Sequence, residues 1–216
     1  MIIKNLLFAS LLTASTGMAA QDVVNLPKPD MKAKSMSVVE TLRTRHSVRE
    51  YATTRLTNQQ LSNLCWAACG VSRDNDHRTA PSALNKKEIR LYVFTEKAVY
   101  EYEPVANRLN VKAKGDHRSL SAGGKAGFKQ VFAQEAPVSL LMVIDLERFG
   151  QQSEQAIRMG CVDAGNVSEN INLYCQSVGL ATVPRATMDT EGIRALLKLS
   201  DKQIPIMNNP VGWPKK

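Results

Sequence analysis

Ser139-Leu-Leu-Met-Val-Ile-Asp145, together with the longer segment from Ser153 to Val178, decides the fold of this chain. The first is a continuous apolar run between polar residues, which is typical of a strand inside a sheet. The second places apolar side chains at helical spacing, and Gly179 directly after it is a common helix-ending residue. The apolar positions are Ile157, Cys161, Ala164, Ile171, Cys175 and Val178. The sequence therefore predicts a central strand followed by one long helix.

Small residues make parts of this helix thin. They are Gly160, Ala164, Gly165 and Ser168. Small side chains let another element approach a helix closely. The neighbour is either a second copy of the chain in a dimer interface or another element of the same fold, and the sequence leaves both readings open.

Helix signals also appear before this central part. Ser37 is a candidate N-cap, and Thr57 with Gln60 three residues later forms a capping-box pattern. The helix after Thr57 is expected to end near Gly70. Residues 71–85 are polar and irregular, so they are predicted to form a loop.

The remaining elements indicate a class that mixes helices with antiparallel strands. Short alternating runs separated by turn residues predict strands at 89–95, 98–103 and 108–112. A helix is predicted over 117–135, although Gly123 and Gly124 weaken its middle. After it come a short strand or turn at 181–184, a helix capped by Asp189 or Thr190, and a last strand at 204–211. We expect an α+β fold with a mixed or antiparallel central sheet flanked by helices.

The N-terminus has the layout of a secretory signal peptide. A weakly basic start precedes an apolar run from Leu6 to Ser15, and small residues lead up to Ala20. The run is shorter than the ~20 residues that span a bilayer, so we expect no stable membrane insertion. The predicted organisation is a signal peptide at 1–20, an extended arm at 21–36 and one domain at 37–216. We expect an exported protein, periplasmic or secreted.

The net charge and the positions of the cysteines and histidines bear on nucleic-acid binding, disulfides and metal sites. The formal net charge is +8, but the basic residues are scattered and not interleaved with aromatic residues, so nucleic-acid binding is not expected. The four cysteines lie in apolar helical patterns, where free thiols behave as small apolar groups; a disulfide is the alternative. They are Cys65, Cys69, Cys161 and Cys175. The three histidines show no metal-ligand spacing, and no Asp/Glu pair stands out by spacing.

One short basic cluster suggests an anion site. Arg45-His46-Ser47-Val48-Arg49 places two guanidinium groups and a hydroxyl within five residues, just after a predicted helix. Arginine binds phosphate through a planar fork of donors, and serine adds a further hydrogen bond. The alternative is a solvated surface segment, which such clusters often are.

This cluster resembles the Arg-x-Ser-x-Arg/Lys signature of the FMN-dependent nitroreductase family. Further likenesses follow in the family's order across residues 38–214, and Arg78 with the strand Ile89–Val93 is similar to the branch that includes peptide-azoline oxidases. The matching segments are Ala80–Asn85, Asp163–Gly165, Asn170–Leu180, Val183–Asp189 and Pro210–Gly212. The resemblance implies a nitroreductase-like fold, an intertwined homodimer and FMN at the dimer interface.

The resemblance also implies roles for individual residues. Arg45 and Ser47 would hold the FMN phosphate, Arg49 would reach the ribityl chain and the pyrimidine edge, and Asn85 would bind the ring edge from the partner subunit. The backbone of the segment at 184–187 would face the reactive nitrogen of the flavin. Two departures are present: Ala186-Thr187 stands where the family often has Glu-Gly, and the chain has only Lys215 and Lys216 after its last strand as further phosphate ligands. The complete set of candidate cofactor-binding residues is Arg45, His46, Ser47, Arg49, Ser82, Asn85, Pro184, Arg185, Ala186, Thr187 and Lys215.

Three hypotheses of function follow. The first is an FMN-dependent oxidoreductase that moves hydride or electron pairs between a small-molecule donor and acceptor by a ping-pong mechanism. The second is a non-catalytic flavin or small-ligand binding protein. The third is a protein that keeps the fold without a cofactor and acts through its surface. Export separates the protein from cytoplasmic NADH and NADPH, so another electron donor is expected.

Overall fold

A computed structural model describes residues 23–123 and 128–215 of the chain. The predicted signal peptide at 1–20 lies outside these residues. Seven strands form one sheet in the order β1-β6-β5-β4-β7-β9-β8, and all neighbouring pairs are antiparallel. The strands are β1 (Val23–Asn25), β4 (Ile89–Thr95), β5 (Ala98–Glu103), β6 (Arg108–Lys114), β7 (Val138–Asp145), β8 (Ala181–Thr182) and β9 (Gln203–Gly212). The predicted α+β class with an antiparallel sheet is confirmed.

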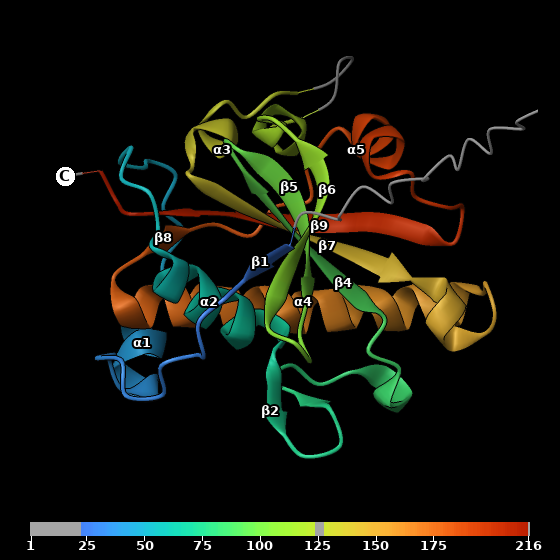
Figure 1. The fold of residues 1–216 in the computed structure, drawn as a ribbon, viewed down its shortest axis with the longest axis horizontal. Coiled ribbons are helices and arrows are strands. Elements are labelled where there is room, and N and C mark those ends of the chain that lie inside the picture. The colour runs from blue at the N-terminus through green and yellow to red at the C-terminus, as the bar shows by residue number, and fades with distance from the viewer. Residues whose placement is uncertain (1–22, 124–127, 216) are drawn as a thin grey trace, which may run out of the picture.

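Helices cover both faces of this sheet (Figure 1). The described α-helices are α1 (Val38–Thr44), α2 (Asn58–Cys69), α3 (Phe132–Glu135), α4 (Glu154–Val178) and α5 (Thr190–Leu197). Three short 3-10 helices, η1 (Ala83–Asn85), η2 (Arg118–Ser121) and η3 (Leu146–Phe149), and a two-stranded hairpin of β2 (Val71–Arg73) and β3 (His77–Arg78) complete the fold. The segment predicted as an extended arm contributes β1 to the edge of the sheet.

Alternation along the two inner strands separates the core into two layers. On β4, Leu91 and Val93 pack toward α2 and α4, whereas Tyr92 and Phe94 pack toward α5. All eight residues of β7 are buried. Because both faces of β7 are covered, its sequence shows no polar alternation, and this is why the apolar run predicted an interior strand.

The long helix α4 packs against the sheet through one of its small residues. Ser153 caps its first turn, and Gly179 ends it in the left-handed conformation with φ of 78°. A Cβ atom at Gly160 would lie 2.7 Å from Cγ2 of Ile144, so this glycine allows α4 to approach β7. A Cβ at Gly165 would meet nothing within 4 Å. Gly160 therefore serves internal packing, whereas Gly165 faces open space.

Two sequence-based expectations were wrong. The segment 117–135 is not one helix: the described residues form η2 and α3, separated by Gly123 at φ of 147°. A Cβ there would lie 2.5 Å from the carbonyl oxygen of Phe128, so this backbone geometry requires glycine. The segment 71–85 is not a plain loop, because the β2–β3 hairpin turns through Asn75 and Asp76, both with positive φ.

Candidate functional site

The segment that follows α1 is held between β8 and the end of the chain. The backbone N–H of Val48 donates to the Thr182 carbonyl at 3.0 Å, and the N–H of Ala52 donates to the Trp213 carbonyl at 2.8 Å. The N–H of Lys215 donates to the carbonyl of Glu50 at 3.2 Å. The chain end therefore runs beside the cluster at 45–49, and Figure 1 shows α1 and the marked C-terminus on the same side of the molecule.

Tyr51 fixes the inner side of this segment. Its hydroxyl reaches the carbonyl oxygens of Val48 and Pro210, and its ring packs against Phe132 and Ala181. Burial raises the pKa of the phenol, although the charges of nearby arginines oppose this shift. The buried tyrosine therefore holds the basic cluster against the sheet, with His46, Ser47 and Arg49 left exposed and Arg45 half-buried.

The arginines of this cluster lack the partners that most arginines of the protein have. Nine described arginines make side-chain hydrogen bonds or ion pairs with other described residues: Arg43, Arg55, Arg78, Arg90, Arg108, Arg118, Arg158, Arg185 and Arg194. Within residues 23–123 and 128–215, the side chains of Arg45 and Arg49 make neither, and the same holds for Arg73 and Arg148. Two unpaired guanidinium groups beside the Ser47 hydroxyl form a donor set that suits a phosphate group.

The segment at 184–187 lies next to this cluster and has one buried member. Arg185 is 6% exposed, and its guanidinium donates to the carbonyls of Ser121 and Ala122 and to the side chains of Gln130 and Asn208. Its backbone N–H and carbonyl are both bonded to Asn208. With four of its five guanidinium N–H donors engaged in the interior, Arg185 positions the segment.

The neighbours of Arg185 remain candidates for direct contact. Pro184 and Ala186 are exposed, and Thr187 is half-buried. The carbonyl of Thr187 accepts a hydrogen bond of 3.1 Å from Nδ2 of Asn208. Nothing in the sequence singles out Asn208, because its role as the support of this segment depends on the pairing of β9 with residue 185.

The other candidates, Ser82 and Asn85, belong to a loop at a different place along α4. The N–H of Ala83 donates to Oδ2 of Asp163 at 2.6 Å, whereas α1 is joined to α4 by the bond from Gln176 to Thr44. Asp163 and Gln176 are thirteen residues apart, or about 20 Å along a helix that rises 1.5 Å per residue. One protomer therefore does not bring Ser82 and Asn85 together with the Arg45 cluster.

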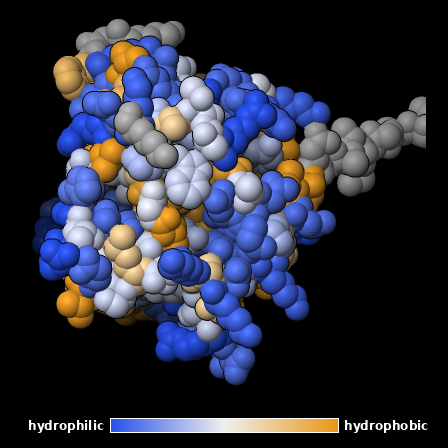
Figure 2. All heavy atoms as spheres, turned by 90° about the vertical axis from the view of Figure 1, so that its left-hand side faces the viewer, coloured by the Kyte–Doolittle hydropathy of each residue, from blue (hydrophilic) through white to orange (hydrophobic). Residues whose placement is uncertain are grey.

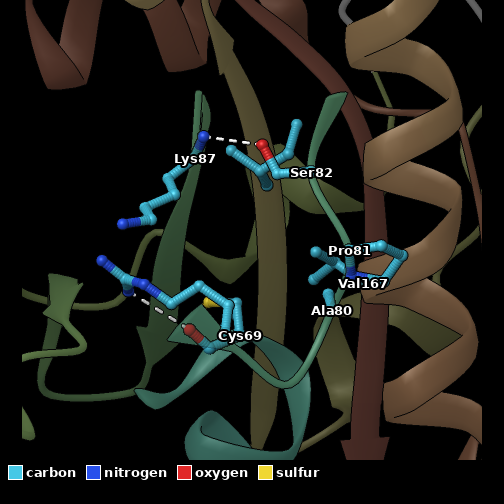
Figure 3. Close-up of a pocket in the computed structure, with 8 residues that line it drawn as sticks. Cys69, Ala80, Pro81, Ser82, Lys87 and Val167 are labelled. Carbon is cyan, nitrogen blue, oxygen red and sulfur yellow. Dashed lines mark hydrogen bonds between the residues drawn. The ribbon is translucent and has the colours of Figure 1, made fainter. Parts of the chain in front are cut away.

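The loop that carries Ser82 and Asn85 is tightly shaped. Leu84, Asn85 and Lys87 all have positive φ, near 50°. The backbone N–H of Lys87 donates to Oγ of Ser82 at 2.6 Å, and that hydroxyl donates to Oε2 of Glu88 at 2.9 Å. Figure 3 shows the bond between Ser82 and Lys87, with the Lys87 side chain extending away from α4. Non-glycine residues rarely adopt positive φ, so this network maintains a costly conformation.

A buried carboxyl pair lies beneath this loop and was not expected from the sequence. Glu88 is fully buried, Asp163 is 4% exposed, and the two carboxyl groups lie close enough to each other to share a proton. Burial, and then the hydrogen bond with Asp163, raise the pKa of Glu88 to about 7. The pair holds the loop against α4, because Asp163 accepts from the N–H of Ala83 and Glu88 accepts from the hydroxyl of Ser82. Spacing gave no sign of it, because the two residues are far apart in the chain.

Other candidate chemistries find less support in the structure. All four cysteines are free thiols, and burial raises the pKa of Cys69 to about 12. Among the described residues, no three His, Cys, Asp or Glu side chains come close enough together to hold a metal ion. No helix of the described chain combines the length and apolar character needed to cross a membrane.

The fold agrees with the comparisons to known proteins. The model of the nitroreductase family matches residues 42–213, and the chain belongs to this family of oxidoreductases. A protein named as a nitroreductase from Methanocaldococcus jannaschii is 30% identical over 201 residues, which are 88% of this chain and 97% of the relative. A protein of Methanothermobacter thermautotrophicus named as an NADH dehydrogenase/NAD(P)H nitroreductase is 24% identical over 190 residues, covering 86% and 81% of the two chains.

A solved structure extends this similarity to the whole fold. The crystal structure of a nitroreductase from Ralstonia eutropha superposes with a TM-score of 0.82 at 31% identity, covering 99% of this chain and 97% of the other. Together with the family match, this confirms the nitroreductase-like fold that the five sequence segments predicted.

Proposed function

We propose that this protein is an FMN-dependent oxidoreductase that acts as a homodimer on a small molecule. The observation that carries the proposal is the pair of unpaired guanidinium groups, Arg45 and Arg49, on either side of Ser47. Guanidinium groups without a partner in the protein are available to bind an anion. The phosphate of FMN has the charge and the acceptor oxygens that this donor set lacks.

The residues present fit FMN in three ways. Arg45, Ser47 and Lys215 would bind the phosphate, since the chain end runs beside the cluster. Arg49, exposed on the same segment, would contact the flavin and stabilise negative charge on the reduced ring. The exposed backbone at Ala186 would approach the ring, held in place by Arg185 and Asn208.

The bound flavin would supply two-electron chemistry, accepting a hydride or electron pair from a donor and passing it to an acceptor in a ping-pong sequence. The chain would position the flavin and choose what stacks on it. The Glu-Gly pattern of many family members is replaced by Ala186-Thr187, and a contact made by the backbone tolerates this change. The likeness of Arg78 and Ile89–Val93 to peptide-azoline oxidases remains a hypothesis about the substrate.

A second copy of the chain is part of the proposal. The separation along α4 means that Ser82 and Asn85 can reach a flavin at the Arg45 cluster only from another subunit. The outer face of α1 supports such an association, because Val38, Val39 and Leu42 are 71%, 77% and 58% exposed. Figure 2 shows the side of the molecule that carries α1, where hydrophobic residues interrupt a mostly hydrophilic surface. Exposed apolar residues grouped on one helix are typical of an interface.

Titration of the purified protein with FMN, followed by flavin fluorescence, tests the proposal. We expect tight binding that weakens about 10- to 100-fold in Arg45→Ala, because a charge-assisted hydrogen bond contributes about 1.5–3 kcal/mol. Arg43→Ala is the matched control: it removes an arginine two residues away that is ion-paired with Glu40. A folded wild-type protein that binds no FMN, or an equal loss in both variants, would reject the proposal.

Export is the second part of the proposal, based on the signal-like residues 1–20. An exported enzyme would use an electron donor other than the cytoplasmic pools of NADH and NADPH. Fractionation of cells that express the full chain, with sequencing of the mature N-terminus, tests this. A start near Gln21 in the exported fraction is expected, and an uncleaved cytoplasmic protein would contradict it.

A further inference from the structure

The geometry points to a second anion site, a basic bay beside Ser82 and Asn85 that binds the carboxylate or phosphate group of a small-molecule substrate. The bay lies between the β2–β3 hairpin and the loop that follows it, and its volume is about 440 Å³. This is within the range of about 300–1,000 Å³ that small-ligand sites occupy. Its functional side chains are Arg73, His77, Arg78, Ser82, Asn85 and Lys87.

The charge of the bay is positive and incompletely neutralised. Arg73, Arg78 and Lys87 line it, and none of the described lining residues is Asp or Glu. Arg78 and Lys87 share a single carboxylate, Asp76, at 3.0 and 3.3 Å. Burial alone would raise the pKa of Asp76, but the two cations outweigh it and hold this pKa below its usual range. Arg73 has no side-chain partner among the described residues, so one carboxylate faces three cations.

The neighbouring hollow shows that this imbalance is particular to the bay. That hollow has a similar volume, about 460 Å³, and shares Arg78 and Lys87 with it. It also contains Arg90 and Arg148, but four carboxylates balance its cations. They are Asp76, Glu101, Glu103 and Asp145. An anion entering this side of the molecule would therefore prefer the bay.

The donors of the bay are held in place before any ligand arrives. The Arg78 guanidinium donates to the carbonyl of Cys69 at 3.3 Å, which is the dashed line at Cys69 in Figure 3, and it is also braced by Asp76. The positive φ of Lys87 and its N–H bond to Ser82 fix the start of the lysine side chain. Pre-oriented donors lose less conformational entropy when a ligand binds, which favours affinity.

The position of the bay gives the anion its role, and here the inference rests on the proposed function. Ser82 and Asn85 belong both to the bay and to the set that would face the flavin of the partner subunit. A molecule whose anionic group sits between Arg73 and Lys87 would extend toward that flavin. The bay would thus select donors or acceptors that carry a carboxylate or phosphate. The phosphate of FMN itself is the other possible source of the same chemistry.

Binding of two matched nitroaromatic probes tests the inference. Isothermal titration with 4-nitrobenzoate and with the neutral 4-nitrobenzyl alcohol, at constant ionic strength and with FMN-loaded protein, gives a ratio of affinities. We expect the carboxylate to bind at least about 10-fold more tightly, and Arg73→Gln to reduce this preference about 10-fold or more, as the loss of one charge-assisted contact implies. Arg148→Gln is the control, since Arg148 is equally unpaired but lines the charge-balanced hollow.

The remaining outcomes distinguish a substrate anion from the FMN phosphate, and the inference about the bay from the proposed FMN-dependent function. An unchanged preference in Arg73→Gln, or an equal loss in Arg148→Gln, overturns the inference. If Arg73→Gln weakens the binding of FMN but not of riboflavin, and leaves the preference for 4-nitrobenzoate intact, the bay holds the cofactor phosphate. The substrate role is then wrong. A wild-type protein that binds no FMN rejects the proposed function. The same titration on that flavin-free protein still decides whether the bay binds the carboxylate.

Discussion

The carboxyl groups of Glu88 and Asp163 lie close together in the interior, where the start of β4 meets the middle of α4. Oε2 of Glu88 accepts from Ser82, but its Oε1 is buried and has no donor among the described groups. One proton shared with Asp163 satisfies this oxygen and removes the repulsion between two buried charges. The pair therefore connects the protonation of Glu88 to the loop that carries Ser82 and Asn85.

This connection predicts a specific dependence of stability on pH. The pKa of Glu88 is about 7 in the folded protein against 4.5 for an ordinary glutamate, so the folded state binds the extra proton. Its contribution is complete below about pH 4.5 and is lost as the pH rises through about 7. Glu88→Gln keeps a proton donor at every pH. We therefore expect the difference in free energy of unfolding between this variant and wild type to shift in favour of the variant by on the order of 2 kcal/mol from pH 5 to pH 8.

Urea unfolding of both proteins between pH 5 and 8 measures this difference. Glu147→Gln is the control, because that carboxylate is exposed. Parallel pH profiles for wild type and Glu88→Gln would show that the pair does not share a proton. Affinity for FMN measured over the same range would show whether the loop transmits the change to the cofactor.

The two glycines of α4 predict opposite effects of the same substitution. Gly160→Ala would place a methyl group within 2.7 Å of Ile144, in a layer with no room, so we expect a loss of about 1–3 kcal/mol in the free energy of unfolding. Gly165→Ala meets open space, and we expect a gain of about 0.5–1 kcal/mol from helix propensity. Chemical denaturation of both variants checks the signs, and equal effects would contradict the packing of α4 on β7.

The contacts of Arg185 predict that replacing it with another cationic residue lowers the stability of the protein. Its guanidinium donates to four acceptors, three of them buried, and lies 5.3 Å from the ring centre of Phe132. A lysine has a single nitrogen and cannot reach these acceptors together, so we expect Arg185→Lys to cost about 2–4 kcal/mol of stability. The exposed Arg158→Lys is the control, with no measurable change expected in denaturant unfolding. A stable Arg185→Lys with unaltered FMN affinity would remove the positioning role.

The parts of the fold that the sequence predicted are those whose signal is local. The apolar run of β7, the spacing of α4 and the capping box at Thr57 each lie within one element, and the structure confirms all three. The helix predicted over 117–135 failed because the unusual backbone of Gly123 outweighs the helical pattern around it. The β2–β3 hairpin was missed because its strands have only two or three residues, too few to show alternation.

In the candidate site, too, the sequence predicted the local features and missed those that depend on contacts between distant residues. The Arg45 cluster is local, so the sequence shows the arginines together, but only the structure shows that they are unpaired. Glu88 and Asp163 meet only because β4 and α4 pack together. The inward direction of Arg185 is set by its pairing with Asn208 on a distant strand. Contacts of this kind depend on tertiary packing, which neither spacing nor periodicity contains.

The exposed face of α1 gives the last prediction, which tests the dimer and the shared cofactor site together. Val39 is 77% exposed, and a carboxylate placed there would be buried without a partner if a second copy covers this face. We expect Val39→Glu to shift the protein from dimer to monomer in sedimentation velocity, with the far-ultraviolet circular dichroism unchanged. Val105→Glu is the control, because Val105 is 69% exposed and belongs to the turn between β5 and β6 rather than to α1.

The same variant separates a shared site from an independent one. If Ser82 and Asn85 reach the flavin only from the other subunit, the monomeric Val39→Glu protein should also lose FMN affinity, although it retains Arg45, Ser47 and Arg49. If the variant is monomeric and binds FMN as wild type does, each protomer holds its cofactor alone. A variant that stays dimeric would instead place the interface elsewhere, and the exposed side of α4 at Val162 and Gly165 would be the next face to substitute.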